Sequence, residues 1–448
     1  MHLTIQLHHD GKWQDAATIA VPSPERGRQG PMRLGYLQEH ALEWMFRDDE
    51  HACSMRLPVE LMLNHSNSAW FAFIDDIMPA GAARRYWLQA LGLVDKPSGL
   101  QDWELLRRGT IAPVGNMRIK EAVPTLPVGS NLPQRRFTIA EVVERQGNFL
   151  EYAQQLGALS GGATGAGGEA PKLLLRCTAD HHVWIDPFQD DDVCDDRHYL
   201  VKFPRGQRSA IDCDILRAEF HYYQELAALG IDTIATAGMQ LHEGSRYPSL
   251  WLPRFDVEWQ QGRLLRHGLE SIYAVLGKAP GSHLNHFTTL RLLVAMLGRQ
   301  WRVSENGEHF DQQRFISSWL QRDLLNIIFG NSDNHGRNCA LLKKPSGIWL
   351  APVYDFAPMK ADPEGIIRTS QWGAPFEEGG EYRWRSITTE LADIADSERL
   401  WLDLQGLASQ LIGLPQRLAE RGVPEQILDF PAIGLAATEA KLQRWGLL

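Results

Sequence analysis

At residues 330–338 the chain reads Gly-Asn-Ser-Asp-Asn-His-Gly-Arg-Asn, and after a short predicted hairpin it reads Tyr354-Asp355-Phe356. Phosphoryl transfer needs a carboxylate that orients the acceptor hydroxyl. It also needs oxygen ligands for the magnesium ions that bridge the nucleotide phosphates. Asp333, Asn338 and Asp355 have the residue types and the order for these roles. The stretch therefore predicts a kinase in which Asp333 is the catalytic base, and Asn338 and Asp355 hold the metal.

The alternative for residues 331–338 is an ordinary polar turn, because Asn, Asp, Ser and Gly favour turns. The context favours a catalytic loop instead. Apolar residues recur at helical spacing from 311 to 329, with Asp311 as the expected N-cap and Gly330 as the expected end of the helix. His335 is expected to fix the loop by packing or hydrogen bonding, since a lone histidine is more often structural than catalytic.

Composition is compatible with this prediction. A chain of 448 residues is expected to form two or three domains, and 44% hydrophobic with 22% charged residues is typical of a soluble globular protein. The five scattered cysteines lack C-x-x-C spacing, which argues against a disulfide framework and a zinc site. No signal-peptide pattern or membrane-spanning run occurs, so a cytoplasmic location is expected. The net charge of −10 argues against direct binding of nucleic acid.

Three blocks are expected along the chain. Residues 1–125 mix strands and helices, residues 126–280 are rich in strands, and residues 281–448 are mainly helical. A proline-rich linker covers 123–133, and Thr138 with Glu141 predicts a capping box just after it. The expected fold class is α+β: a bilobal, protein-kinase-like fold with an N-terminal α/β subdomain, a strand-rich lobe and a mainly helical C-terminal lobe.

The middle block contains the expected nucleotide-binding elements. Residues 157–168 are rich in glycine, which allows backbone amides to approach phosphates, although such runs are often flexible linkers. Lys202 lies in an apolar strand, as a phosphate-binding kinase lysine does. Glu219 lies on an amphipathic helix and is the expected ion-pair partner of Lys202, with Glu225 as a rival. The alternative is a surface lysine and a solvated glutamate.

A second strand, 248–253, runs into Arg254-Phe255-Asp256. Its position suits the hinge that contacts adenine, with Asp256 accepting a hydrogen bond from the ribose. The alternative is an ordinary end of a strand.

Taken together, these motifs resemble the HipA family of serine/threonine kinases, the toxin components of bacterial toxin–antitoxin modules. The resemblance covers nearly the whole chain, and the extended glycine-rich loop is most similar to the YjjJ-like branch. The matching segments are Phe71–Pro79, Ser160-Gly161 through Pro171-Lys172, Arg254-Phe255-Asp256, the pattern Asn331-x-Asp333-x-His335-x-x-Asn338, and Pro352-x-Tyr354-Asp355.

The resemblance implies an ATP- and Mg²⁺-dependent kinase in which Lys202 contacts the phosphates. It also implies that Ser160 autophosphorylates and thereby inactivates the enzyme. Because residues 162–170 lengthen this loop, Thr164 competes with Ser160 as the modified residue. Arg337 stands where the family commonly has lysine. The expected nucleotide-binding residues are Ser160, Gly161, Gly162, Lys172, Lys202, Pro253, Phe255, Asp256, His335, Asn338, Tyr354 and Asp355.

The family also implies partners. These are a protein substrate such as an aminoacyl-tRNA synthetase and a helix-turn-helix antitoxin, with DNA contacted only through the antitoxin and no membrane association. Three alternatives stay open at this point. They are a pseudokinase or regulatory binding protein, a magnesium-dependent enzyme acting on nucleic acid through Asp333, His335, Asn338 and Asp355, and a small-molecule phosphotransferase.

Overall fold

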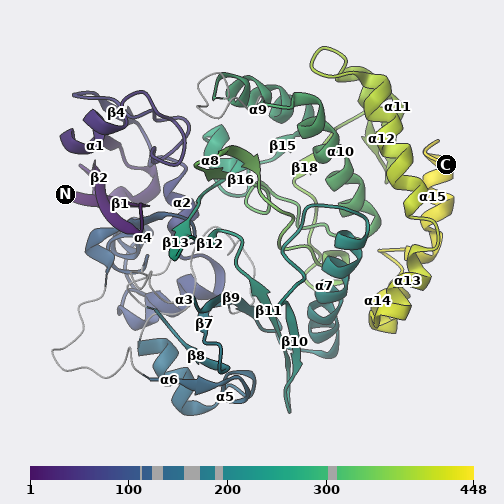
Figure 1. Ribbon diagram of the computed structural model, residues 1–448, viewed down its shortest axis with the longest axis horizontal. Helices are drawn as coiled ribbons and strands as arrows, with labels where there is room; N and C mark the ends of the chain where they lie inside the picture. Colours follow the sequence, from purple (N-terminus) through teal and green to yellow (C-terminus); the bar gives the residue numbers. More distant parts are fainter. Residues whose placement is uncertain (111–113, 124–134, 156–171, 187–194, 301–309) are drawn as a thin grey trace. The chain divides into compact units, whose positions relative to one another are not determined.

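The computed structural model describes the chain outside residues 111–113, 124–134, 156–171, 187–194 and 301–309 (Figure 1). Internal contacts divide it into two compact units. The first unit comprises Met1–Gly206, Ala237–Pro280 and Ala340–Pro345. The second comprises Gln207–Thr236, Gly281–Cys339 and Ser346–Leu448. The domain boundaries expected near residues 125 and 280 remain predictions, because these units follow contacts rather than chain order.

The N-terminal part of the first unit is an antiparallel sheet with the strand order β4-β3-β2-β1-β5. Alternate residues of β1, Leu3, Ile5 and Leu7, enter its core, as the period of a strand requires. The strands are β1 (His2–His9), β2 (Lys12–Ala20), β3 (Met32–Tyr36), β4 (Asn64–Asn67) and β5 (Met117–Ile119). The helices are η1 (Pro24–Gln29), α1 (Gln38–Glu43), α2 (Ile74–Ile77), α3 (Gly81–Ala90), α4 (Ser98–Arg108) and η2 (Lys120–Ala122).

The segment Phe71–Pro79, one of the motifs singled out in the sequence, makes contacts that join distant parts of the first unit. Asp75 accepts a bond of 2.5 Å from the Arg28 guanidinium. Asp76 accepts a bond of 2.8 Å from the backbone N–H of Ser271 in β14 (Gly268–Ser271). Asp75 and Asp76 therefore have a structural role, because each carboxylate binds a part of the chain that is distant in sequence.

The strand-rich part of the first unit is a six-stranded sheet with the order β10-β11-β9-β7-β8-β6. The predicted capping box is confirmed: the Thr138 side chain accepts from the Glu141 N–H while the Glu141 carboxylate accepts from the Thr138 N–H. The strands are β6 (Phe137–Thr138), β7 (Lys172–Cys177), β8 (His182–Trp184), β9 (Arg197–Lys202), β10 (Gln240–Glu243) and β11 (Pro248–Pro253). The other elements are α5 (Ile139–Val143), α6 (Gly147–Gln155), β12 (Val257–Gln260), β13 (Arg263–Arg266), α8 (Ile272–Leu276) and β16 (Ala340–Lys344), the last paired with β14.

The second unit is mainly helical, as expected. Helix α10 (Gln312–Ile328) matches the prediction closely, because the Asp311 side chain accepts a bond of 2.9 Å from the Arg314 N–H. Gly330 follows the helix at φ +71°, and a Cβ atom there would lie 2.8 Å from Ile433. The unit also contains α7 (Ala210–Ala228), β15 (Leu284–Asn285), α9 (His286–Gln300), β17 (Gly347–Leu350), η4 (Met359–Ala361), β18 (Ser370–Gln371), β19 (Glu377–Glu378) and β20 (Glu381–Tyr382).

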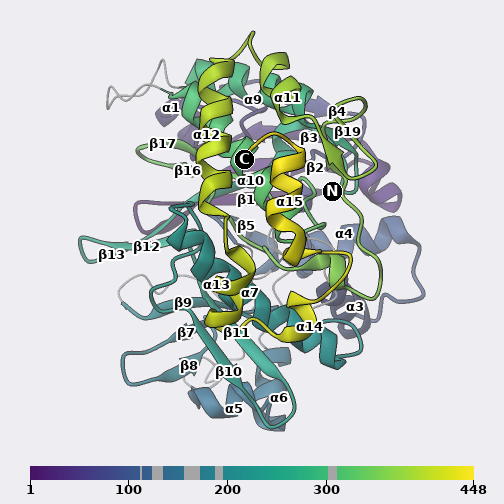
Figure 2. The same ribbon diagram turned by 90° about the vertical axis from the view of Figure 1, so that its right-hand side faces the viewer.

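The C-terminal helices of the second unit face the viewer in Figure 2. Helix α12 lies along α10, where the Ser317 hydroxyl donates to Asp403 over 2.7 Å. The helices are α11 (Trp384–Glu390), α12 (Ser397–Gln410), α13 (Leu414–Arg421), α14 (Glu425–Leu428), η5 (Leu435–Ala437) and α15 (Thr438–Arg444). Among the described helices, none is both long and apolar enough to cross a bilayer.

Glu225 on α7 is fully buried, and its carboxylate accepts from Arg417 and Arg421 of α13 over 2.8 and 2.6 Å. These bonds anchor α13 on α7. They occupy both oxygens of the residue that was the rival of Glu219 for the pairing role.

Candidate active site

The loop after α10 is held by hydrogen bonds within the second unit. The Asn338 side-chain N–H donates to the Asp333 carbonyl over 2.6 Å, and its backbone N–H donates to the His335 carbonyl over 2.9 Å. At the start of the loop, Asn331 donates to the side chain of Asn326 on α10 over 2.9 Å. The Asn, Asp, Ser and Gly residues of this loop thus form a turn. The hydrogen bonds of Asn338 fix the orientation of its side-chain amide.

The amide oxygen of Asn338 is buried and accepts no hydrogen bond from the described residues. A buried oxygen without a donor normally costs about 1–3 kcal/mol, so an oxygen held in this way fits a bound cation. Mg²⁺ prefers oxygen ligands such as amide carbonyls and carboxylates. Asn338 and Asp355, the residues expected to hold the metal, supply this donor set.

Asp333 and His335 face each other in the loop. The His335 Nε2 atom lies 3.4 Å from the Asp333 Oδ1 atom, and the two side chains are 18% and 20% exposed. The Arg337 backbone N–H donates to His335 Nδ1 over 3.3 Å. Because Nδ1 accepts this bond, the ring proton lies on Nε2, directed at the Asp333 carboxylate. His335 therefore orients a carboxylate that is still open to solvent.

Asp355 has a left-handed backbone with φ +53°, a region that residues other than glycine seldom occupy. Beside it, the Tyr354 hydroxyl donates to the Arg337 carbonyl over 2.5 Å. That bond joins the residue before Asn338 to the residue before Asp355. Strained backbone of this kind concentrates at functional sites, where the surroundings hold it in place.

Glu219 is buried on α7 and accepts a bond of 3.0 Å from the Tyr223 hydroxyl. The same hydroxyl accepts from the Phe356 backbone N–H over 3.2 Å. Burial raises the pKa of Tyr223 well above its ordinary value, and the charges of Glu219 and Asp355 raise it further. Tyr223 was missed from the sequence, although its place one helical turn after Glu219 puts both on one face.

In the first unit, Lys172 and Lys202 are cross-strand neighbours on β7 and β9, and both are buried. The expected lysine-bearing strand is confirmed. Glu219 belongs to the second unit, and its ion pair with Lys202 therefore stays a prediction.

Asp256, expected to meet a ribose, is buried in the first unit. The Arg254 guanidinium donates to its two oxygens over 2.9 and 2.5 Å, and the Gly115 N–H donates to Oδ2 over 2.6 Å. Burial alone would raise the pKa of Asp256, but Arg254 and the Gly115 N–H leave it below its ordinary value. These contacts hold the chain in place just after the end of β11.

Pro253 and Phe255 flank Arg254 and are half-buried. The glycine-rich loop, including Ser160, Gly161, Gly162 and Thr164, lies outside the described residues. The roles proposed for these residues stay predictions.

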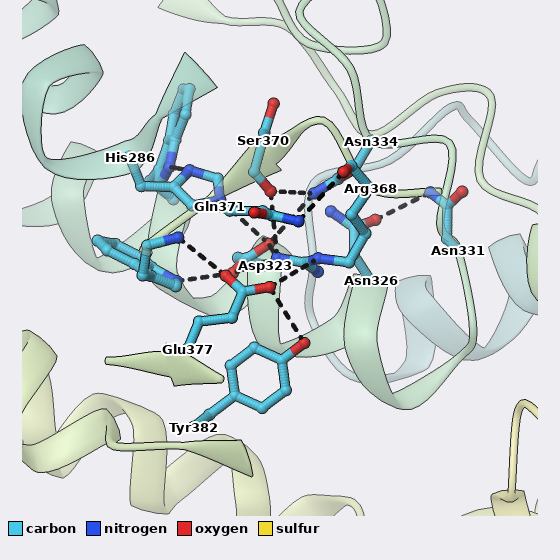
Figure 3. Close-up of polar contacts among 12 residues, drawn as sticks. His286, Asp323, Asn326, Asn331, Asn334, Arg368, Ser370, Gln371, Glu377 and Tyr382 are labelled. Carbon is cyan, nitrogen blue, oxygen red and sulfur yellow. Dashed lines mark hydrogen bonds and ion pairs between the residues drawn. The ribbon is translucent and has the colours of Figure 1, made fainter. Parts of the chain in front are cut away.

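A buried polar network in the second unit lies against the loop that follows α10 (Figure 3). Asp323 on α10 accepts from Arg368 over 3.0 Å and from the Trp372 indole over 2.8 Å, and it lies 3.5 Å from His286. Arg368 also pairs with Glu377 at 3.3 Å. Burial alone would raise the pKa of Asp323, but the charges of Arg368 and His286 hold it well below its ordinary value.

Asn334 connects this network to the loop. Its side-chain N–H groups lie 3.4 Å from Asp323 Oδ1 and from the Ser370 carbonyl, which are long hydrogen bonds (Figure 3). Asp323 and Arg368 carried no local signal in the sequence, because their pairing depends on chain segments that meet only in the fold. The network ties the residue next to Asp333 to the helix and to the segment that follows Asp355.

Comparisons with known proteins identify a family and a fold for this chain. A family model described as HipA-like C-terminal domain matches residues 164–412. The serine/threonine-protein kinase toxin HipA of Shewanella oneidensis is 25% identical over 171 residues, which are 35% of this chain and 36% of the relative. The match thus spans about a third of that protein's length.

Solved structures give the fold. HipA in a complex with HipB and operator DNA, from the Shewanella oneidensis MR-1 toxin–antitoxin system, matches with a TM-score of 0.64 and 17% identity. The match covers 99% of this chain and 97% of that one. The Helicobacter pylori proinflammatory kinase CtkA matches with a TM-score of 0.37 and 11% identity, over 61% of this chain and 89% of its own. The expected α+β, kinase-like fold is confirmed at the level of the HipA fold.

Proposed function

Because the chain belongs to the HipA-like C-terminal domain family, we propose that it is an ATP- and Mg²⁺-dependent serine/threonine protein kinase. The observation that carries the proposal is the Asn338 amide, whose N–H is fixed on the Asp333 carbonyl while its buried oxygen lacks a donor among the described residues. A loop that presents an acceptor in this way is suited to a metal-bound nucleotide.

Each residue has a role in this proposal. Asp333 orients the acceptor hydroxyl and takes its proton, and His335 holds the Asp333 carboxylate in place. Asn338 and Asp355 hold the metal, which when bound neutralises charge on the transferred phosphate. Lys172 and Lys202 bind the nucleotide phosphates, and Glu219 orients Lys202.

Autophosphorylation on the glycine-rich loop is part of the proposal. Ser160, or Thr164 in the extended loop, receives the phosphate. Added negative charge at a site that binds nucleotide phosphates repels ATP, which makes the modification an off-switch.

A toxin role with a helix-turn-helix antitoxin is proposed from the family and from the HipA–HipB–DNA complex. The net charge of −10 favours DNA contact through the antitoxin rather than through this chain. The proposed substrate is a protein, with aminoacyl-tRNA synthetases as the first class to assay.

Intact mass after incubation with Mg²⁺ and ATP tests the proposal, with peptide mapping to locate the modification. We expect one added phosphate on Ser160 or Thr164 in the wild type and none in Asp333→Gln, which should remain soluble and folded. General-base removal lowers such rates by about 10²–10⁴-fold.

Two outcomes would contradict the proposal. A wild-type chain that starts unmodified, gains no phosphate and phosphorylates no protein, yet binds ATP, would be a pseudokinase or regulator. Cleavage of DNA or RNA without ATP, lost in Asp355→Ala, would instead identify an enzyme acting on nucleic acid.

A further inference from the structure

Two neighbouring tyrosines on α7 differ in what their hydroxyl groups contact. Both Tyr222 and Tyr223 are fully buried. The Tyr222 ring packs on Phe329 and Phe356, with ring centroids 4.8 and 6.1 Å apart, and its hydroxyl has no hydrogen-bond partner among the described residues. The Tyr223 hydroxyl has two bonds, one to Glu219 and one from Phe356.

The two bonds of Tyr223 link segments far apart in the sequence. Glu219 lies one helical turn before Tyr223, whereas Phe356 lies 133 residues after it, directly beyond Asp355. The hydroxyl donates its single proton to the Glu219 carboxylate and receives the Phe356 N–H on its oxygen. Both bonds involve the Tyr223 hydroxyl oxygen. A movement of Glu219 that shifts this oxygen therefore also changes the hydrogen bond to the Phe356 backbone N–H.

The backbone at Asp355 needs such support. Its φ of +53° costs energy for a residue with a Cβ atom. The Phe356 ring is fixed by Phe329, with centroids 5.4 Å apart, and its N–H is fixed by Tyr223. Because the Asp355–Phe356 peptide is held on the Phe356 side, the left-handed turn at Asp355 is kept in place.

We infer that Tyr223 is a positioning residue that couples Glu219 on α7 to the metal-binding conformation of Asp355. This inference rests on the proposed kinase function, in which Glu219 orients the phosphate-binding lysine and Asp355 holds Mg²⁺. The coupling makes the metal site complete only when Glu219 is in place.

The chain offers a matched pair of variants. Tyr223→Phe removes the bridging oxygen and keeps the buried ring, while Tyr222→Phe removes a neighbouring oxygen that has no partner among the described residues. Electron paramagnetic resonance measures Mn²⁺ binding in the presence of a non-hydrolysable ATP analogue. Autophosphorylation rate, KM for ATP and urea unfolding are measured on the same full-length chains.

We expect Tyr223→Phe to weaken Mn²⁺ binding about 10-fold or more, as loss of a group that orients a metal ligand does. The autophosphorylation rate should fall and the Mg²⁺ requirement should rise, with little change in KM for ATP. Tyr222→Phe should bind Mn²⁺ like the wild type.

The inference is overturned if the wild type is an active kinase and Tyr223→Phe matches it in Mn²⁺ binding and rate. It is also overturned if Tyr223→Phe only loses stability, or if Tyr222→Phe weakens Mn²⁺ binding equally, because packing would then explain the effect. A wild-type chain that neither binds Mn²⁺ nor transfers phosphate would overturn the proposed function as well, which separates the two failures.

Discussion

Two polar segments that the sequence marked as functional differ in how their side chains are satisfied. In the first unit, Arg254 and the Gly115 N–H occupy both oxygens of Asp256. In the loop of the second unit, buried oxygens of four neighbouring residues accept no hydrogen bond from the described residues. They are Asn331 Oδ1, Ser332 Oγ, Asn334 Oδ1 and Asn338 Oδ1.

This difference distinguishes a structural contact, at Asp256, from a candidate ligand-binding site, in the loop from Asn331 to Asn338. Desolvation offsets much of what a buried ion pair contributes, but removing one partner is costly because the other charge is left buried and unpaired. Buried oxygens without donors cost free energy in the isolated chain and become favourable only when water or a ligand satisfies them. We therefore assign Asp256 a mainly structural role and expect ligand binding at the loop, which the following three changes examine.

Asp256→Ala should give the largest effect on stability. It leaves the Arg254 guanidinium, whose side chain is 4% exposed, without its partner. Loss of one member of a buried pair costs about 3–5 kcal/mol of unfolding free energy, measured by urea denaturation at neutral pH. The control is Asp393→Ala, which breaks an exposed pair with Arg291 and should cost less than about 1 kcal/mol. Equal stability losses in the two variants would remove the distinction between the segments.

Asn338→Ala should show the opposite pattern. Loss of this proposed metal ligand should lower Mg²⁺-dependent phosphate transfer by about 100-fold or more, equivalent to about 2.7 kcal/mol. Stability should fall by only about 1 kcal/mol. The bond to the Asp333 carbonyl is lost, but a buried oxygen that has no donor among the described residues is removed with it. If Asn338→Ala greatly lowered the free energy of unfolding but left phosphate transfer normal, the loop would have a structural role like that of Asp256.

Asp323→Asn should lower stability less than Asp256→Ala does, and with a distinctive pH dependence. The folded pKa of Asp323 lies below its unfolded value of about 3.9, so its stabilisation is present above that value and is lost as pH falls through the folded pKa. At pH 7 the variant should be less stable by about 2 kcal/mol.

Between pH 5 and pH 3 the gap between wild type and Asp323→Asn should narrow by about 1 kcal/mol, which thermal unfolding at each pH measures. A gap that stays constant over this range would show that the carboxylate charge does not stabilise the network around Arg368.

Local elements were predictable to within one or two residues. The helical spacing, the Asp311 cap and Gly330 defined α10, and the capping box at Thr138 was correct, because these features depend on residues close together in the chain. Long-range pairs were not predictable. Tyr223 with Phe356 and Asp323 with Arg368 each join distant segments, and no local pattern marks such partners.

By itself, the sequence determined helix α10 with its cap, the capping box at Thr138, the lysine on β9 and the residue types of the loop from Asn331 to Asn338. These follow from periodicity, capping and turn preference, which act over a few residues. Only the tertiary structure decided that Glu225 anchors α13, that both oxygens of Asp256 accept hydrogen bonds, and that the Asn338 oxygen accepts none from the described residues. Whether a buried polar group finds a donor depends on which distant backbone or side chain the fold brings to it.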